Sequence, residues 1–256
     1  MKEYIFRNKP VTFPESIDEL TPDQYEYYIF LASMLAGEML SLQNWRIRWF
    51  SYLAGLKRVN YTILHQEYIQ QAKANLLQVT DCFLKNEQGK VAPTFATCRN
   101  LLPEYNGFKG PADWLNGLKF GKFVQGVTLL DQIKPGTADR YIYEEIARVL
   151  YSIPEGTEVP AVLTWHAPVL FHNVCEAIQS GPIKINGREI NLSIIFKNSG
   201  PSRPDDKTGW AGITFEVAAA GVFGNVHELD DSDFWAVLLY LYKCKFEYNH
   251  EKKYNK

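Results

Sequence analysis

Residues 21–37 read TPDQYEYYIFLASMLAG and predict the first long helix of the chain. Thr21 can cap the helix, Pro22 suits its first turn, and Gln24 can bond back to the capping nitrogen. Apolar residues then recur three or four positions apart, as a helix with one buried face requires. These apolar positions are Tyr28, Leu31, Leu35 and Met39, and Gly37 ends or loosens the helix.

Further helices are expected on the C-terminal side of this stretch, and an extended segment on its N-terminal side. Ser41 is placed to cap a second helix that ends near Gly55, and residues 60–78 have the spacing of a third. Residues 4–6 and 11–13 are short apolar pieces bracketed by prolines, which favours a strand or an extended arm. The N-terminal part of the chain is therefore predicted to be mainly helical.

Two β-hairpins interrupt the helical pattern. Residues 79–84 and 91–96 flank a polar loop that contains Gly89, and the Asn186-Gly187 pair stands between alternating apolar residues from Ile183 to Ile190. Asn-Gly is a favoured two-residue hairpin turn. Asn106-Gly107 marks a further turn.

The second half of the chain shows more helical stretches. Residues 118–133 and a stretch capped by Thr137 are predicted helices, as are residues 165–179, with Pro168 near the start. The polar residues 198–207 read as a loop or linker. The last two predicted helices are residues 210–221 and 233–252.

These elements predict an α+β fold that is mainly helical, with bundle-like helix packing and two small β-hairpins. Three parts follow from the pattern: residues 1–100 with the first hairpin, residues 101–197 with the Asn-Gly hairpin, and residues 198–256 with the C-terminal helices. A single compact domain containing all three is the alternative.

Composition narrows the classes of function. The chain has 256 residues, 46% of them hydrophobic, and a net charge of −2, so it is expected to fold and to have no overall attraction for nucleic acid or anionic membranes. Its four cysteines are far apart, which predicts isolated thiols in a reducing cytoplasm. The N-terminal residues MKEYIFRNKP do not resemble a secretory signal. The longest apolar run has nine residues, whereas a membrane span needs about 20.

No catalytic, cofactor-binding or metal-binding residue is predicted, because neither a nucleophile elbow nor a phosphate-binding loop occurs. His172, Cys175 and Glu176 would share one helix face and could approach a metal ion, but a structural zinc site takes four ligands. A half-buried histidine beside an apolar thiol is the simpler interpretation.

Charged clusters have simple structural explanations. Asp230, Asp231 and Asp233 precede a helix and are expected to cap it, and Asp205-Asp206 reads as part of a solvated turn. Lysines 243–256 make the C-terminal end basic. We expect a solvated helix end there, with a contact to nucleic acid as the alternative.

The run from Phe234 to Tyr242 reads FWAVLLYLY and is apolar on every side of a helix. Such a helix must be covered, either by the core of the chain or by a partner or a second copy. This makes it the candidate partner-binding segment. The candidate residues are Phe234, Trp235, Leu238, Leu239 and Tyr242.

Three segments occur in an order that resembles a known group of proteins. They are residues 13–25, FPESIDELTPDQY; residues 100–123, which contain NLLPE, GPAD and LKFGKF; and residues 217–224, VAAAGVFG. This order is similar to proteins encoded among the tail genes of Bacteroidetes phages and prophages, which resemble tail assembly chaperones. The resemblance covers most of the chain and carries no catalytic residue.

The resemblance implies a non-enzymatic role in phage morphogenesis, in the cytoplasm of the bacterial host. The implied partner is the tape measure protein or the tail tube protein. One alternative is a structural virion component, either a tail or a connector subunit. The other is a small enzyme whose site the sequence does not reveal.

Overall fold

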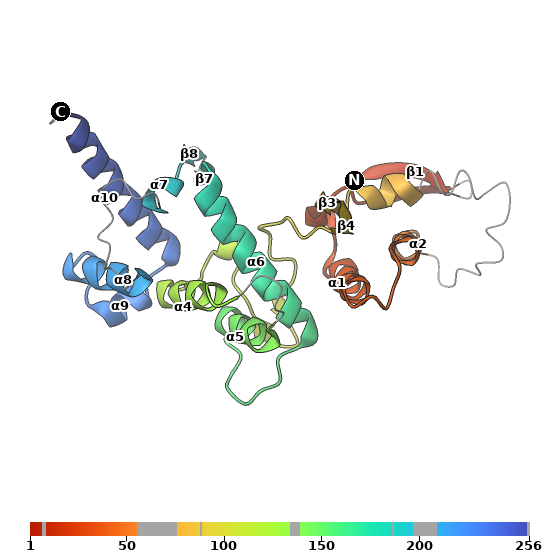
Figure 1. Cartoon of the computed structure of the whole chain (residues 1–256), viewed down its shortest axis with the longest axis horizontal. Helices are drawn as coiled ribbons and strands as arrows, with labels where there is room; N and C mark the ends of the chain where they lie inside the picture. Colours follow the sequence, from red (N-terminus) through yellow and green to blue (C-terminus); the bar gives the residue numbers. More distant parts are fainter. Residues whose placement is uncertain are drawn as a thin grey trace. The chain divides into compact units, whose positions relative to one another are not determined.

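The computed structural model describes residues 1–6, 9–55, 76–87, 89–133, 139–185, 187–196 and 209–254. The chain divides into two compact units, Met1–Thr97 and Cys98–Lys256 (Figure 1). Helices predominate in the described part, and four two-stranded antiparallel sheets accompany them. The prediction of a mainly helical α+β fold is confirmed, and β1–β2 and β5–β6 add two sheets to the two predicted hairpins.

The described residues of the first unit form two small sheets and two long helices. Its elements are β1 (Lys2–Phe6), β2 (Lys9–Phe13), η1 (Ile17–Glu19), α1 (Pro22–Ala36), α2 (Leu42–Leu53), β3 (Leu84–Glu87) and β4 (Lys90–Pro93). The predicted caps are confirmed: Thr21 and Gln24 form a reciprocal capping box, and Ser41 accepts from the backbone N–H of Asn44. Gly37 is the C-cap of α1.

Aromatic side chains form the core of the first unit. Tyr28, Trp45 and Trp49 are fully buried, and the Tyr28 ring meets both indoles edge-on at centroid distances of 5.9 and 5.2 Å. The Tyr28 hydroxyl donates to the carbonyls of Phe83 and Thr94 and so holds the chain on both sides of the β3–β4 hairpin. The core of this unit therefore contains a polar anchor for its hairpin.

The predicted strand over residues 79–84 is wrong at its start. Residues 76–81 are helical, and β3 begins only at Leu84. Val79 is buried against Phe13 and Phe50, so tertiary packing overrides the β-propensity of the short apolar run. Most of the predicted helix 60–78 lies outside the described residues.

The second unit is built around three helices, α4 (Phe120–Leu130), α5 (Arg140–Tyr151) and α6 (Ala161–Ser180), which pack together (Figure 1). Gly126 of α4 lies so close to α6 that an added Cβ would stand 2.6 Å from the Phe171 ring. The other elements are β5 (Glu104–Tyr105), β6 (Phe108–Lys109), η2 (Asp113–Leu115), β7 (Ile183–Ile185), β8 (Arg188–Ile190), α7 (Ser193–Phe196), α8 (Gly209–Ala219), α9 (Val226–Asp230) and α10 (Phe234–Tyr254).

Two predicted helix starts in this unit are wrong. The N-cap of α5 is Asp139 instead of Thr137, and α6 begins at Ala161, so that Pro168 lies inside the helix. An interior proline removes one backbone hydrogen bond. Burial on both sides of the proline offsets that loss, because Leu163 and Phe171 are both fully buried.

Two further predictions concern the Asn-Gly hairpin and the linker over residues 198–207. The Asn-Gly hairpin is confirmed as β7–β8, in which Ile185 pairs with Arg188. The linker 198–207, including Asp205 and Asp206, lies outside the described residues. Across the described helices, none is both long and apolar enough to cross a membrane.

Candidate functional site

Helix α10 begins inside the core of the second unit. Phe234 stacks on Phe123 with ring centroids 5.1 Å apart, and Phe234, Val237 and Leu238 are fully buried. The backbones of Leu118 and Phe234 are joined by a 3.1 Å hydrogen bond. This packing fixes the first two turns of α10 against α4.

Of the three aspartates predicted to cap α10, Asp233 does so, whereas Asp230 is the last residue of α9 and Asp231 is its C-cap. Asp233 Oδ1 accepts from the backbone N–H of Ala236 at 3.0 Å, which caps the first turn. Asp231 pairs with Lys119 at 2.6 Å, and this hydrogen bond lowers the pKa of the Asp231 carboxyl. The acidic cluster therefore joins α10 to the residue before α4.

The five predicted partner-binding residues have different environments. Phe234 and Leu238 belong to the core, so a partner could reach only the other three. The Trp235 indole N–H donates to the carbonyl of Trp114 at 3.0 Å, which holds this half-buried ring in place. Leu239 and Tyr242 are also half-buried.

Beyond Tyr242 the helix leads away from α4, α8 and α9 (Figure 1), and its side chains become mostly exposed. Phe246 is 53% exposed and stacks on Tyr242 at a centroid distance of 5.9 Å. Trp235, Leu239, Tyr242 and Phe246 follow one another at spacings of four, three and four residues, which places them on one side of α10. We call these four residues the aromatic stripe.

Sequence reasoning missed Phe246 because the apolar run stops at Tyr242. The signal was present, since Phe246 stands four residues after Tyr242 and therefore on the same helix face. A search by helical spacing would have extended the candidate site by one turn.

A groove lies along another side of α10, between this helix and α8. It has a volume of about 520 Å³. Glu216 and Lys245 supply one charge of each sign to its walls. Its other lining residues are Ile195, Ile213, Val217, Ala220, Tyr240, Leu241, Cys244 and Tyr248. Helix α10 thus offers a partner both a stripe and a groove.

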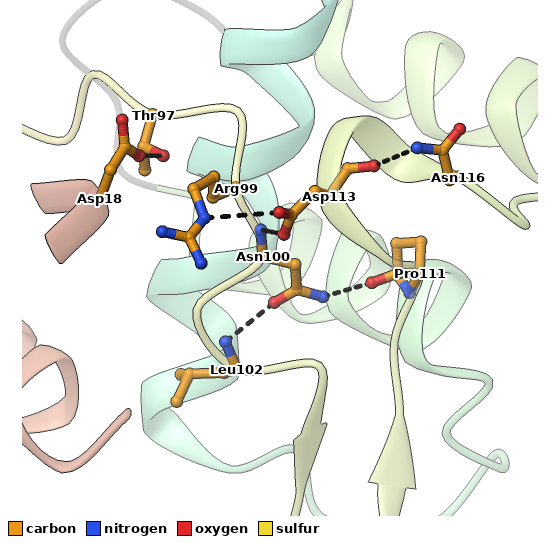
Figure 2. A network of polar contacts seen from close by, with 8 residues as sticks. All are labelled: Asp18, Thr97, Arg99, Asn100, Leu102, Pro111, Asp113 and Asn116. Carbon is orange, nitrogen blue, oxygen red and sulfur yellow. Dashed lines mark hydrogen bonds and ion pairs between the residues drawn. The ribbon is translucent and has the colours of Figure 1, made fainter. Parts of the chain in front are cut away.

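A buried polar network lies elsewhere in the second unit, around Asn100 (Figure 2). Its side-chain amide donates to the carbonyl of Pro111 at 2.6 Å and accepts from the backbone N–H of Leu102 at 2.9 Å. Tyr151 of α5 donates to the Leu102 carbonyl at 2.8 Å, and His166 Nε2 lies 2.8 Å from Asn100 Oδ1. Because Oδ1 can only accept, Nε2 of His166 carries the proton.

Burial sets the ionisation of this network. Desolvation lowers the pKa of His166 to about 3 and raises that of Tyr151, so both side chains are neutral at pH 7. Asp113 adds an outer contact, because its carboxylate accepts from the backbone N–H of Asn100 at 2.9 Å (Figure 2). The described polar groups satisfy one another's hydrogen-bonding capacity. The network thereby holds the segment that precedes α4 against α5 and α6.

The predicted histidine face of α6 borders a pocket beside α4 of about 560 Å³. His172 and Glu176 are exposed and 3.8 Å apart, whereas Cys175 is buried and its pKa is raised to about 12 by desolvation. Among the described residues, no three His, Cys, Asp or Glu side chains are placed to hold a metal ion. The neutral, buried thiol agrees with the simpler interpretation of this face, but the prediction of a half-buried histidine is wrong because His172 is exposed.

Comparison of the chain with protein-family models, curated proteins and solved structures finds no match.

Proposed function

We propose that the protein is a non-enzymatic phage or prophage morphogenesis protein, and that it acts as a tail assembly chaperone that binds the tape measure protein. The observation that carries the proposal is the exposed end of the aromatic stripe on α10. The helix is anchored in the core at Phe234, yet it presents Phe246 to solvent one turn beyond Tyr242.

An anchored helix with exposed aromatic rings is suited to binding another helix. Large aromatic side chains contribute much buried area in interfaces, and they lose little conformational entropy because they are stiff. Tyr242 is already held by stacking on Phe246. Helical partners are commonly recognised through apolar residues three and four positions apart, which is the spacing of the stripe.

The resemblance supplies the identity of the partner. The segments that resemble tail assembly chaperones include residues 217–224, which run from the end of α8 towards α9, and the candidate surface follows directly on α10. In the proposal the protein works in the host cytoplasm, where it covers the tape measure protein until the tail tube encloses it.

The test is a pull-down of the tagged full-length chain from cells that produce the phage, with purified virions examined in parallel by mass spectrometry. The proposal predicts that the tape measure protein is recovered with the chain and that the chain is missing from virions. Tyr141→Ala, which removes an exposed ring from α5, serves as the control for Phe246→Ala.

Abundance of the chain in virions would contradict the chaperone role and would favour a tail or connector subunit. Recovery of the tape measure protein by wild type and by Tyr141→Ala, together with its loss from Phe246→Ala, would support the role assigned to α10.

A further inference from the structure

The charged residues that border the aromatic stripe are basic. Each residue of an α-helix is rotated by about 100° from the one before it, so Lys243 flanks the stripe on one side and Lys245 on the other. Lys243 is exposed, and the Lys245 ammonium lies 6.0 Å from the centre of the Tyr248 ring. The nearest acidic residues of the helix, Glu247 and Glu251, lie outside these two borders.

Lys243 is exposed to a partner, whereas Lys245 is half-buried at the edge of the groove that Glu216 also lines. Lys243 approaches Glu247 at 3.9 Å, but both side chains are largely exposed, at 72% and 60%. Exposed ion pairs of this kind contribute little to stability. A partner carboxylate can therefore replace the contact at little cost.

We infer that the aromatic stripe binds an acidic amphipathic helix of another protein, with apolar residues at spacings of three and four and with glutamate or aspartate on both borders. The inference rests on the proposed function, because it describes the chemistry of the partner at the same site. Opposite charges beside an apolar seam select the partner of a helix, as they do in coiled coils.

A second copy of the chain fits this surface poorly. If two α10 helices paired through their stripes, the border residues of both would be Lys243 and Lys245, so like charges would meet whether the helices ran parallel or antiparallel. Glu247 and Glu251 offset the attraction of Lys243 and Lys245 for an anionic membrane, whereas Lys252, Lys253 and Lys256 would add to it, so membrane binding is an outcome of the test.

The test uses the purified full-length protein and two fluorescent peptides of about three heptads each. Both peptides carry leucine along the seam; one has glutamate and the other lysine at the border positions. Fluorescence anisotropy at low ionic strength should show that the glutamate peptide binds about tenfold more tightly than the lysine peptide. Raising the salt concentration should shrink the difference, because the border charges are exposed.

Two double variants test the residues that carry the inference. K243E/K245E should reverse the preference between the peptides, and K243Q/K245Q should remove it. The matched control is K109E/R188E, which makes the same change in net charge at exposed positions on β6 and β8 and should keep the wild-type preference. Circular dichroism would check that each variant retains its helices.

Equal binding of the two peptides by the wild-type protein, or the same loss of preference in the control variant, would overturn the inference. So would a concentration-dependent dimer that Phe246→Ala abolishes, or binding to phosphatidylserine vesicles without any preference between the peptides. The outcome is separable from the proposed function: preference for the glutamate peptide with no tape measure protein in the pull-down would refute the function and leave the inference standing.

Discussion

Asn100 joins separate segments of the second unit. Its amide contacts the neighbouring Leu102 backbone and also the Pro111 carbonyl and His166, which come from two other parts of the chain. Nothing in the local sequence predicts this, because a lone Asn-Leu-Leu-Pro stretch reads as the start of a loop. Contacts over such distances in the chain are visible only after folding.

Replacement of Asn100 by alanine should lower the free energy of unfolding of the second unit by about 3 kcal/mol or more, since it leaves several buried partners without a hydrogen bond. Asn116→Ala is the control, because Asn116 is exposed and its side chain donates a hydrogen bond to the Asp113 carbonyl. It should cost about 0.5–1 kcal/mol. Urea denaturation followed by fluorescence measures the free energy of unfolding of both variants. Equal losses in the two variants would show that the buried network contributes no more to stability than the exposed hydrogen bond of Asn116.

His166 should make the stability of the second unit depend on pH. Its pKa is about 3 in the folded state and 6.5 when exposed, so below pH 6.5 the unfolded chain binds a proton that the folded chain does not. Stability should therefore fall with decreasing pH, by about 1.4 kcal/mol per unit at most, through this window.

The measurement is the urea midpoint at pH 7 and at pH 5, where most carboxyl groups remain ionised. His166→Gln can still donate to Asn100 but does not titrate, so its midpoint should change less between the two pH values. The same change in wild type and variant would assign the pH dependence to other groups.

At the scale of elements, signals that act over a few residues predict the observed structure, whereas the effects of tertiary packing are not predicted. The capping box at Thr21 and the Asn-Gly turn of β7–β8 act over a few residues, and the structure has both. The interior Pro168 of α6 and the helical residues 79–81 were not predicted, because burial overrides local propensity at both places.

The cap of α1 should contribute measurably to the first unit. Thr21→Ala removes the oxygen that accepts from the backbone N–H of Gln24, and the expected loss is about 1 kcal/mol. Thr21→Ser keeps the oxygen and should stay within a few tenths of wild type. Chemical denaturation of the three proteins compares them, and a serine variant as unstable as the alanine variant would rule out the cap as the cause.

The close approach of α4 and α6 at Gly126 should not tolerate a side chain. Gly126→Ala places a methyl group against the Phe171 ring and should cost about 1–3 kcal/mol through overpacking. Gly181→Ala is the matched control, because no atom lies within 4 Å of its added Cβ and its backbone is extended. Thermal unfolding should show a lower midpoint for the first variant only; a matching drop in the control would point to the loss of glycine itself.

At the scale of the whole molecule, the fold class followed from helical spacing, turns and composition, whereas the surface did not. An apolar run predicts that a helix is covered, but it does not divide the helix into core and surface. The structure makes that division in α10: Phe234 and Leu238 are buried, and Phe246, beyond the run, is exposed. Which residues remain for a partner depends on how α4 packs against the helix.

Site-specific crosslinking in cells that produce the phage tests directly whether Phe246 contacts the tape measure protein. A photoreactive phenylalanine analogue would replace Phe246 in one version of the chain and Tyr141, an exposed ring on α5, in another. We expect a crosslink from position 246 to the tape measure protein and none from position 141. No crosslink at position 246, a crosslink only to a second copy of the chain, or equal crosslinking at both positions would contradict this expectation.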